Sequence, residues 1–132
     1  MRRSLALVLA AIALAGCGGG KSDEEQVRDT VRQFFTALQK RDAKKFCDEF
    51  LTEEFIRQST GATGDRAHEE CRRQFRTLQA SNVELARIHR VRIKGGEATV
   101  RATVRTQGGT RPQVFRLKKE DGDWRLEGGG TQ

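Results

Sequence analysis

Three turn dipeptides in the C-terminal half constrain the fold of this chain more than any other feature. They are Gly95-Gly96, Gly108-Gly109 and Asp121-Gly122, and each suits a two-residue hairpin between antiparallel strands. Between these turns, apolar residues alternate with polar ones, which is the period of a strand with one buried face. The pattern therefore predicts a four-stranded antiparallel meander that begins near Val83.

The three turns also predict the register of the strands. If each dipeptide forms a two-residue turn, Val100 lies opposite Leu117 in the second hairpin. Ile88 is out of step with the neighbouring apolar residues, which predicts a β-bulge near residues 88–90. A one-residue slip would move every apolar side chain to the other face. The register then places one apolar residue of each strand in a single row: Val91, Val100, Leu117 and Leu126.

The same register gathers basic residues on the opposite face of the sheet. Residues 81–132 hold 11 basic and 6 acidic residues, whereas residues 17–80 hold 12 of each. One interpretation is a solvated face, and the other is contact with anionic lipid headgroups or an anionic wall polymer. Nucleic acid is a poor partner, because no aromatic side chains interleave with the basic ones for base stacking. The predicted basic face consists of Arg90, Arg92, Arg101, Arg116, Lys118 and Arg125.

Residues 1–16 have the pattern of an export signal. Arg2 and Arg3 give a positive start, and an apolar run follows from Leu5 to Ala15. That run has 11 residues, whereas a membrane-spanning helix needs roughly 20. We therefore expect a signal peptide and no permanent transmembrane helix.

The tetrapeptide Leu14-Ala15-Gly16-Cys17 resembles the lipobox of bacterial lipoproteins. The resemblance implies cleavage before Cys17, lipid on its sulfur, and attachment to the extracytoplasmic face of the cell membrane. Two or three acyl chains give a lasting anchor, whereas one chain holds a protein only marginally. Residues 17–22 would then form the lipidated cysteine and its tether. The alternative is an ordinary signal peptide that has a cysteine near its end.

If Cys17 is lipidated, Cys47 and Cys71 remain as an even pair in an oxidising compartment. This favours a disulfide between them, and the alternative is two buried free thiols. No cysteine has a Cys or His partner at the usual ligand spacing. The sequence therefore predicts neither a metal site nor a catalytic thiol.

Apolar periodicity predicts three helices before the sheet. Ser22 begins a capping box for a helix over residues 23–40. Asp42 is expected to cap a second helix, with a further turn after Thr52, and Asp65 is expected to cap a third. The inward-facing residues would be Val27, Val31, Phe34, Phe35 and Leu38 in the first helix, Ala43, Phe46, Cys47 and Phe50 in the second, and Ala67, Cys71, Phe75 and Leu78 in the third.

Three segments resemble parts of nuclear transport factor 2-like domains. They are the first helix from Val27 to Asp42, the hairpin from Gly95 to Val100 and the closing strand from Gly122 to Leu126. The chain is also similar to small secreted bacterial lipoproteins. The resemblance implies an α+β domain over residues 23–130, in which three N-terminal helices pack on a curved four-stranded antiparallel sheet. Such a domain is cone-shaped, with a pocket at its open end.

That superfamily includes both enzymes and non-catalytic binding modules, so the fold does not select a function. An isomerase of this kind needs a pocket carboxylate and an oxyanion donor, commonly Tyr, and the chain has no Tyr. The polar candidates for an inward position are Asp48, His68, His89 and Gln113, and their spacing gives no catalytic or metal-binding set.

We therefore predict a membrane-anchored, extracytoplasmic binding or accessory module without a cofactor. Its candidate partners are a small apolar ligand, a partner protein and an anionic surface. The alternative is a small isomerase, cyclase or hydrolase that uses the cone pocket. Back-to-back pairing of two sheets is expected to be disfavoured unless an anion lies between them, because it would bring two basic faces together. The sequence leaves the oligomeric state open.

Overall fold

The computed structural model describes residues 20–78 and 82–131. The predicted signal peptide and Cys17 lie outside the described residues. The α+β fold class is confirmed, with four antiparallel strands and four helices where three helices were expected. The elements are α1 Asp23–Gln39, α2 Ala43–Glu49, α3 Glu53–Thr60, α4 Gly64–Thr77, β1 Glu84–Lys94, β2 Glu97–Thr106, β3 Gly109–Glu120 and β4 Asp123–Thr131.

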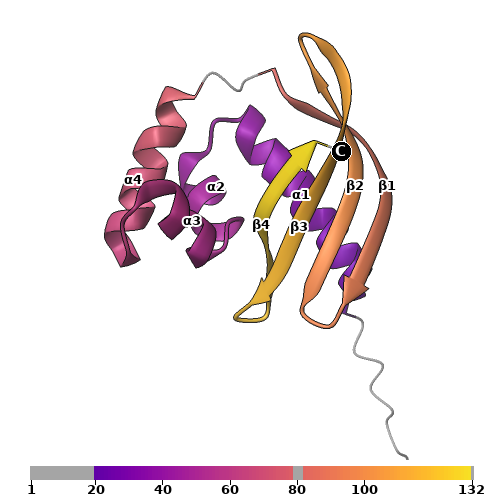
Figure 1. Ribbon diagram of the computed structural model, residues 1–132, viewed down its shortest axis with the longest axis horizontal. Coiled ribbons are helices and arrows are strands. Elements are labelled where there is room, and N and C mark those ends of the chain that lie inside the picture. The colour runs from indigo at the N-terminus through magenta and orange to yellow at the C-terminus, as the bar shows by residue number, and fades with distance from the viewer. Residues whose placement is uncertain (1–19, 79–81, 132) are drawn as a thin grey trace, which may run out of the picture.

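The strands form one sheet in the order β1-β2-β3-β4, with antiparallel neighbours throughout. In Figure 1, α1 crosses behind the sheet, and α2, α3 and α4 lie beside β4. The predicted meander is therefore correct. The first and third turns also have the predicted register, since Val91 pairs with Val100 and Leu117 pairs with Leu126.

The register of the second hairpin differs from the prediction by two residues. Val100 lies opposite Phe115 and not opposite Leu117, because Thr106 pairs with Gly109 and the turn is made by residues 107–108. The Thr106 hydroxyl donates a hydrogen bond of 3.2 Å to the Gly109 carbonyl across this turn. Side chains alternate with a period of two, so a two-residue shift leaves every residue on its predicted face. Apolar alternation could not distinguish the two registers.

Strand β1 contains two bulges. The predicted one lies between Ile88 and Arg90, and a second, which was not predicted, lies between Leu85 and Arg87. Each bulge adds one residue to β1, so Leu85 and Ile88 both pair with buried residues of β2 despite their odd spacing. Bulges bend a strand and increase its twist, which fits the curvature of this sheet.

Side-chain caps fix the starts of three helices. Ser22, Asp42 and Thr52 accept hydrogen bonds from backbone N–H groups three residues further on, at 3.1–3.2 Å. The turn predicted after Thr52 is a complete helix of eight residues, α3, which ends at Gly61 with φ +71°. This extra helix is the reason that the predicted number of helices was wrong.

Two predictions for α4 were also wrong. The helix begins at Gly64 after Thr63, which makes no side-chain cap bond, and Asp65 lies in the first turn. Leu78 was expected to face inward, but it is 49% exposed. The helix ends at Thr77, and the backbone of Leu78 is already extended. The side chain therefore leaves the face that carries Ala67 and Phe75.

The core lies between α1 and the sheet and extends under the shorter helices. The predicted disulfide is present, and it joins α2 to α4 through Cys47, which is fully buried, and Cys71. Phe46 of α2 packs on Phe34 of α1 and on Phe75 of α4, with ring centroids 4.9 and 4.5 Å apart. The helices thus form one packed layer with α1.

Backbone hydrogen bonds tie the helical layer to the edge of the sheet. The N–H of Leu126 donates to the Phe50 carbonyl at 2.7 Å, and the N–H of Thr52 donates to the Leu126 carbonyl at 3.0 Å. These bonds form a parallel bridge between β4 and the segment that connects α2 to α3. The bridge determines how close that segment lies to the start of β4.

Candidate functional site

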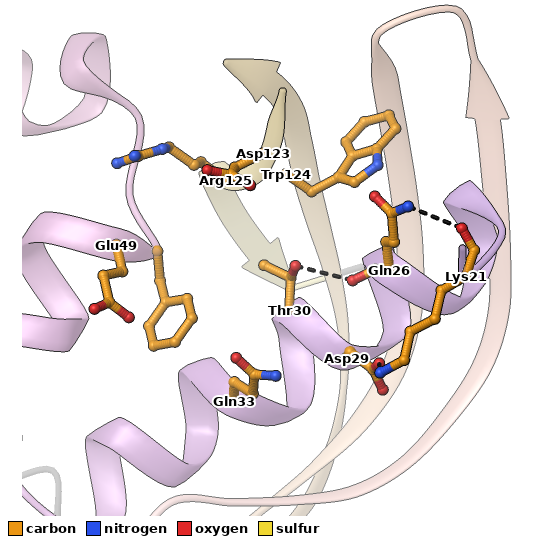
Figure 2. Close-up of a pocket in the computed structure, with 10 residues that line it drawn as sticks. Lys21, Gln26, Asp29, Thr30, Gln33, Glu49, Asp123, Trp124 and Arg125 are labelled. Carbon is orange, nitrogen blue, oxygen red and sulfur yellow. Dashed lines mark hydrogen bonds and ion pairs between the residues drawn. The ribbon is translucent and has the colours of Figure 1, made fainter. Parts of the chain in front are cut away.

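A cavity of about 450 Å³ lies between α1, the start of β4 and the end of α2. Figure 2 shows its lining, with α1 forming one wall and Asp123, Trp124 and Arg125 facing it from β4. The cavity therefore adjoins the bridge between β4 and the helices. Its lining residues are Lys21, Gln26, Asp29, Thr30, Gln33, Glu49, Phe50, Asp123, Trp124 and Arg125.

The α1 wall is a stripe of uncharged polar residues: Gln26, Thr30 and Gln33 recur at helical spacing beside the buried apolar stripe. The Thr30 hydroxyl donates to the Gln26 carbonyl at 2.9 Å, and the Gln26 amide donates to the Lys21 carbonyl at 2.9 Å. These bonds hold two of the side chains in place. The side-chain oxygen of Gln26 and the amide of Gln33 have no hydrogen bond within the described residues, so they could bind a ligand.

At the outer end of this wall, Lys21 forms an ion pair with Asp29. Hydrogen bonding to Lys21 lowers the pKa of the Asp29 carboxyl, and the same bond raises the pKa of Lys21. Both groups therefore stay charged at neutral pH. Since each charge faces the other, this end of the cavity is polar without a large net charge.

The β4 wall is fixed by contacts with the start of α1. The indole nitrogen of Trp124 donates to a carboxylate oxygen of Asp23 at 3.3 Å, and the Lys119 ammonium lies 3.2 Å from the same oxygen. Hydrogen bonding to Lys119, and then to Trp124, lowers the pKa of Asp23. Trp124 is only 3% exposed, so most of its side chain packs in the core although the residue also lines the cavity.

Arg125 differs from its predicted role on the basic face. Its register partner is Lys118, but its guanidinium reaches the helices and donates to the Asp48 carbonyl at 2.8 Å. Its Nε is the one buried side-chain nitrogen or oxygen in the described parts of the chain that lacks a hydrogen-bond partner. Arg125 therefore supplies a positive charge beside the cavity, because β4 is the strand nearest the helices.

The chemistry of this lining suits binding by hydrogen bonds. Of the ten lining residues, only Phe50 and Trp124 are apolar. Apolar atoms of these and other side chains nevertheless form about half of the lining surface, so the cavity also offers contacts to the apolar part of a small ligand. Apart from Arg125, none of these residues was predicted as a site residue from the sequence. The one sequence feature that could have indicated this wall is the spacing of Gln26, Thr30 and Gln33, which places the three residues on one face of a helix.

A second cluster surrounds His68. Its Nδ1 lies 2.7 Å from a carboxylate oxygen of Asp48, and its Nε2 lies 2.6 Å from one of Glu53. Burial lowers the pKa of His68, but the hydrogen bonds from Asp48 and Glu53 outweigh it, so the pKa is raised. An imidazolium with both nitrogens donating to carboxylates has no free lone pair, so His68 is not placed to act as a general base.

Arg72 completes this cluster. Its Nη1 lies 2.9 and 2.8 Å from the two carboxylate oxygens of Asp48. The cluster of Asp48, Glu53, His68 and Arg72 thus joins α2, α3 and α4 beside the disulfide. The structure brings together two residues, Asp48 and His68, that the sequence suggested only separately.

The other two polar candidates do not join either cluster. His89 lies at the bulge of β1, and its Nε2 is 2.6 Å from the Thr103 hydroxyl. Gln113 pairs with Ala102 in the middle of the sheet and is half-buried. Neither residue lines the cavity between α1 and β4.

The remaining residues of the predicted basic face lie on the outer face of the sheet, although Arg116 and Lys118 are shifted by two positions relative to β2. Arg90 pairs with Arg101, and Arg92 and Arg116 lie on either side of Thr99. Lys118 lies opposite Glu97. All five basic side chains are exposed. These five side chains therefore lie together on the outer face of β1, β2 and β3.

Within residues 20–78 and 82–131, no helix is both long enough and apolar enough to cross a membrane. The same residues contain no group of three or more His, Cys, Asp or Glu side chains arranged to hold a metal ion.

Residues 22–126 match the model of a protein family described as putative lumazine-binding. No curated protein matches the chain significantly. Three solved structures of similar fold illustrate its structural relatives. A cystatin-like protein of unknown function from Nostoc punctiforme has a TM-score of 0.51 and 21% identity, over 79% of this chain and 85% of that one.

A putative NTF2-like transpeptidase from Campylobacter jejuni has a TM-score of 0.51 and 16% identity, over 80% of this chain and 98% of that one. A phospholipid-binding protein from Ralstonia solanacearum, solved with a phospholipid, has a TM-score of 0.50 and 13% identity, over 85% of this chain and 79% of that one. These likenesses confirm the nuclear transport factor 2-like, cystatin-like fold.

Proposed function

The chain belongs to the putative lumazine-binding family, and from that premise we propose that it is a lipid-anchored module that binds a small heteroaromatic ligand between α1 and β4. The observation that carries this proposal is the polar stripe of α1, Gln26, Thr30 and Gln33, which lines a cavity of about 450 Å³ together with Trp124 and Arg125 of β4. Small-molecule sites commonly have volumes of roughly 300–1,000 Å³ and a few convergent polar groups.

The lining favours a flat, hydrogen-bonding ligand over an acyl chain. A lumazine carries carbonyl and N–H groups around a planar ring, which match the amides of Gln26 and Gln33 and the guanidinium of Arg125. The Ralstonia relative binds a phospholipid, but acyl chains gain their free energy from apolar walls. Apolar atoms supply about half of the lining surface, and an acyl chain would leave the polar half without hydrogen-bond partners.

The site supports binding without catalysis. The carboxylates Asp29, Glu49 and Asp123 line the cavity, but the chain has no Tyr to serve as the oxyanion donor that an isomerase of this kind commonly uses. Asp29 is held as an anion by Lys21. The alternative of a small isomerase, cyclase or hydrolase gains no support from the His68 cluster, because both nitrogens of that ring are engaged.

The proposed anchor would hold this cavity at the membrane. Lys21 lines the cavity and follows Cys17 by only four residues. Since an extended chain spans at most about 3.6 Å per residue, the cavity would lie within about 15 Å of the lipidated cysteine. Support for the anchor comes from the sequence Leu14-Ala15-Gly16-Cys17 and the apolar run before it. A Cys17→Ser variant should move from the membrane fraction to the soluble fraction.

The ligand can be tested with a soluble chain that begins at Gly18, because every residue of the described core lies between Val27 and Leu126. Trp124 is the only tryptophan and borders the cavity, so its fluorescence should change as lumazine is added. Gln33→Ala should weaken binding about fivefold, the value of one hydrogen bond of about 1 kcal/mol. Gln39→Ala, at the far end of the same helix, is the matched control.

Absence of saturable lumazine binding would contradict the ligand class. If a short-chain phospholipid bound instead, and Gln33→Ala weakened that binding about as much, the cavity would still be the binding site but its ligand would be a lipid. Equal loss in Gln33→Ala and Gln39→Ala would show that the cavity is not the binding site.

A further inference from the structure

A second, smaller cavity of about 170 Å³ adjoins the larger one near the end of α1. The two cavities share Gln33 and Phe50 as lining residues. Figure 2 shows Gln33 at the end of the α1 wall that lies away from Lys21. The smaller cavity therefore continues the larger one along α1. Its lining residues are Gln33, Thr36, Ala37, Lys40, Asp42, Lys45 and Phe50.

The α1 wall of both cavities is one face of the helix, because residues three or four positions apart lie on the same side. Gln26, Thr30 and Gln33 line the larger cavity. Ala37 and Lys40 line the smaller one and extend the same row by two turns. The step from Gln33 to Lys40 is about 10 Å along the helix axis. A ligand side chain of that length would reach from the larger cavity into the smaller one.

Backbone hydrogen bonds hold the smaller cavity in place beside the larger one. Phe50 is buried, and its carbonyl accepts the N–H of Leu126 at 2.7 Å. At the turn between α1 and α2, the N–H of Asp42 donates to the Ala37 carbonyl at 2.9 Å. These bonds fix the end of α1 and the start of α2 relative to the larger cavity.

The larger cavity has a small excess of negative charge. Its lining contains two basic residues and three acidic ones: Lys21, Arg125, Asp29, Glu49 and Asp123. Lys21 and Asp29 are paired with each other. An anionic group on a ligand therefore gains no net attraction from this lining.

The smaller cavity has the opposite balance. Lys40 and Lys45 are its basic residues, and Asp42 is its acidic one. A carboxylate oxygen of Asp42 caps α2 by accepting the N–H of Lys45 at 3.1 Å. Neither lysine ammonium group forms an ion pair or hydrogen bond within residues 20–78 and 82–131. Two ammonium groups free to bind an oxyanion therefore lie at this end of α1.

Two further acids on α2 do not line the smaller cavity. Asp48 is bonded to His68 and Arg72. Glu49 lines the larger cavity and not the smaller one. Lys44 is exposed on α2 and adds a further positive charge. The acidic lining residue of the smaller cavity therefore offsets only part of the positive charge around it.

We propose that the smaller cavity binds an anionic group, a phosphate or a carboxylate, at the end of a side chain of the ligand. This inference rests on the proposed binding of the ligand's ring in the larger cavity. The ligand class is then a heteroaromatic ring with an anionic side chain, whose charge lies between Lys40 and Lys45. The smaller cavity is well below the roughly 300 Å³ of an independent ligand site, which favours one part of a longer ligand over a separate molecule.

The test compares riboflavin with riboflavin 5′-phosphate, which differ only in a terminal phosphate and whose ring contains that of lumazine. Flavin fluorescence anisotropy reports their binding to the soluble chain from Gly18. The phosphate should tighten binding about tenfold at low salt, since each partly exposed charge contact contributes up to about fivefold. This preference should shrink as salt is raised, because surface charge is screened within about 10 Å at 0.1 M.

The variant Lys40→Gln, Lys45→Gln should bind both flavins with the affinity that the wild type has for riboflavin. The matched control, Lys44→Gln, Lys94→Gln, has the same net charge and leaves the lining of both cavities intact. It should keep the tenfold preference within about twofold. Circular dichroism of both variants confirms that each is folded. Equal loss of the preference in the two variants would show that only net charge matters and would overturn the proposal.

Two other outcomes would also overturn it. One is equal affinity of the wild type for the two flavins. The other is displacement of riboflavin 5′-phosphate by inorganic phosphate at the same concentration, which would assign the smaller cavity to a free anion. Binding of riboflavin without a preference for the phosphate contradicts this inference alone. If lumazine, riboflavin and riboflavin 5′-phosphate all fail to bind, the proposed function fails, and this inference fails with it.

Discussion

His68 Nδ1 lies 2.7 Å from a carboxylate oxygen of Asp48, although the two residues are 20 positions apart and belong to different helices. Glu53 holds the other ring nitrogen, and Arg72 holds the remaining oxygen of Asp48. The other charged groups around this cluster are Asp65 and Glu69 on α4. Together these contacts favour the protonated ring.

We expect the stability of the domain to depend on pH through His68. Its pKa is raised above the ordinary value of 6.5, so its stabilisation is fully present below that value and is lost as the pH rises through the folded pKa. Relative to the wild type, His68→Gln should lower the free energy of unfolding by about 1 kcal/mol near pH 5. The difference should shrink toward pH 9, as measured by urea denaturation.

His89→Gln is the control for this prediction, because within the described residues the side chain of His89 bonds to the Thr103 hydroxyl and to no carboxylate. Its effect should not follow the same pH dependence. A deficit in His68→Gln that stays constant from pH 5 to pH 9 would show that the ring acts through packing alone.

The disulfide should contribute much of the stability of the helical layer. Closing a loop of 24 residues between Cys47 and Cys71 is worth about 3 kcal/mol in the chain-entropy model. The double variant Cys47→Ala, Cys71→Ala should therefore melt at a lower temperature. Dithiothreitol should lower the melting temperature of the wild type and leave that of the double variant unchanged. An effect of dithiothreitol on both proteins would contradict this account.

Gly129 should not tolerate a side chain. A Cβ at this position would lie 3.1 Å from the ring of Phe115, which packs on Phe35 with ring centroids 5.7 Å apart and cannot move freely. Gly129→Val should destabilise the domain by about 1–3 kcal/mol, the usual cost of overpacking. Gly130→Val is the control, because a Cβ there meets nothing within 4 Å. Equal melting temperatures for the two variants would refute the prediction.

The parts of the fold that were predictable from sequence depend on local chemistry. The caps at Ser22, Asp42 and Thr52 need only a side chain and a backbone N–H three residues away. The first and third hairpins have turn dipeptides that suit a two-residue loop. In the second hairpin, residues 107–108 and the dipeptide Gly108-Gly109 both give acceptable turns. Both turns leave Phe115 on the face toward α1, so the apolar pattern does not choose between them.

The candidate site was less predictable because it depends on how elements approach one another. His68 and Arg72 are one helical turn apart, so sequence places them on one face of α4, but nothing local indicates that Asp48 of α2 faces them. The same holds for Arg125. Strand alternation places it on the basic face, and only the bridge between β4 and the α2–α3 connection brings Asp48 within its reach.

The two bulges of β1 make the edge of the sheet less able to pair with the edge of another molecule. β1 is an edge strand of 11 residues, and a long straight edge offers unpaired backbone groups to the edge of another molecule. The extra residues at Ala86 and His89 interrupt that row and twist it. A second sheet could then match the edge over only a few consecutive residues. The bulges that make the register of β1 irregular therefore also disfavour aggregation of the domain through its edge strand.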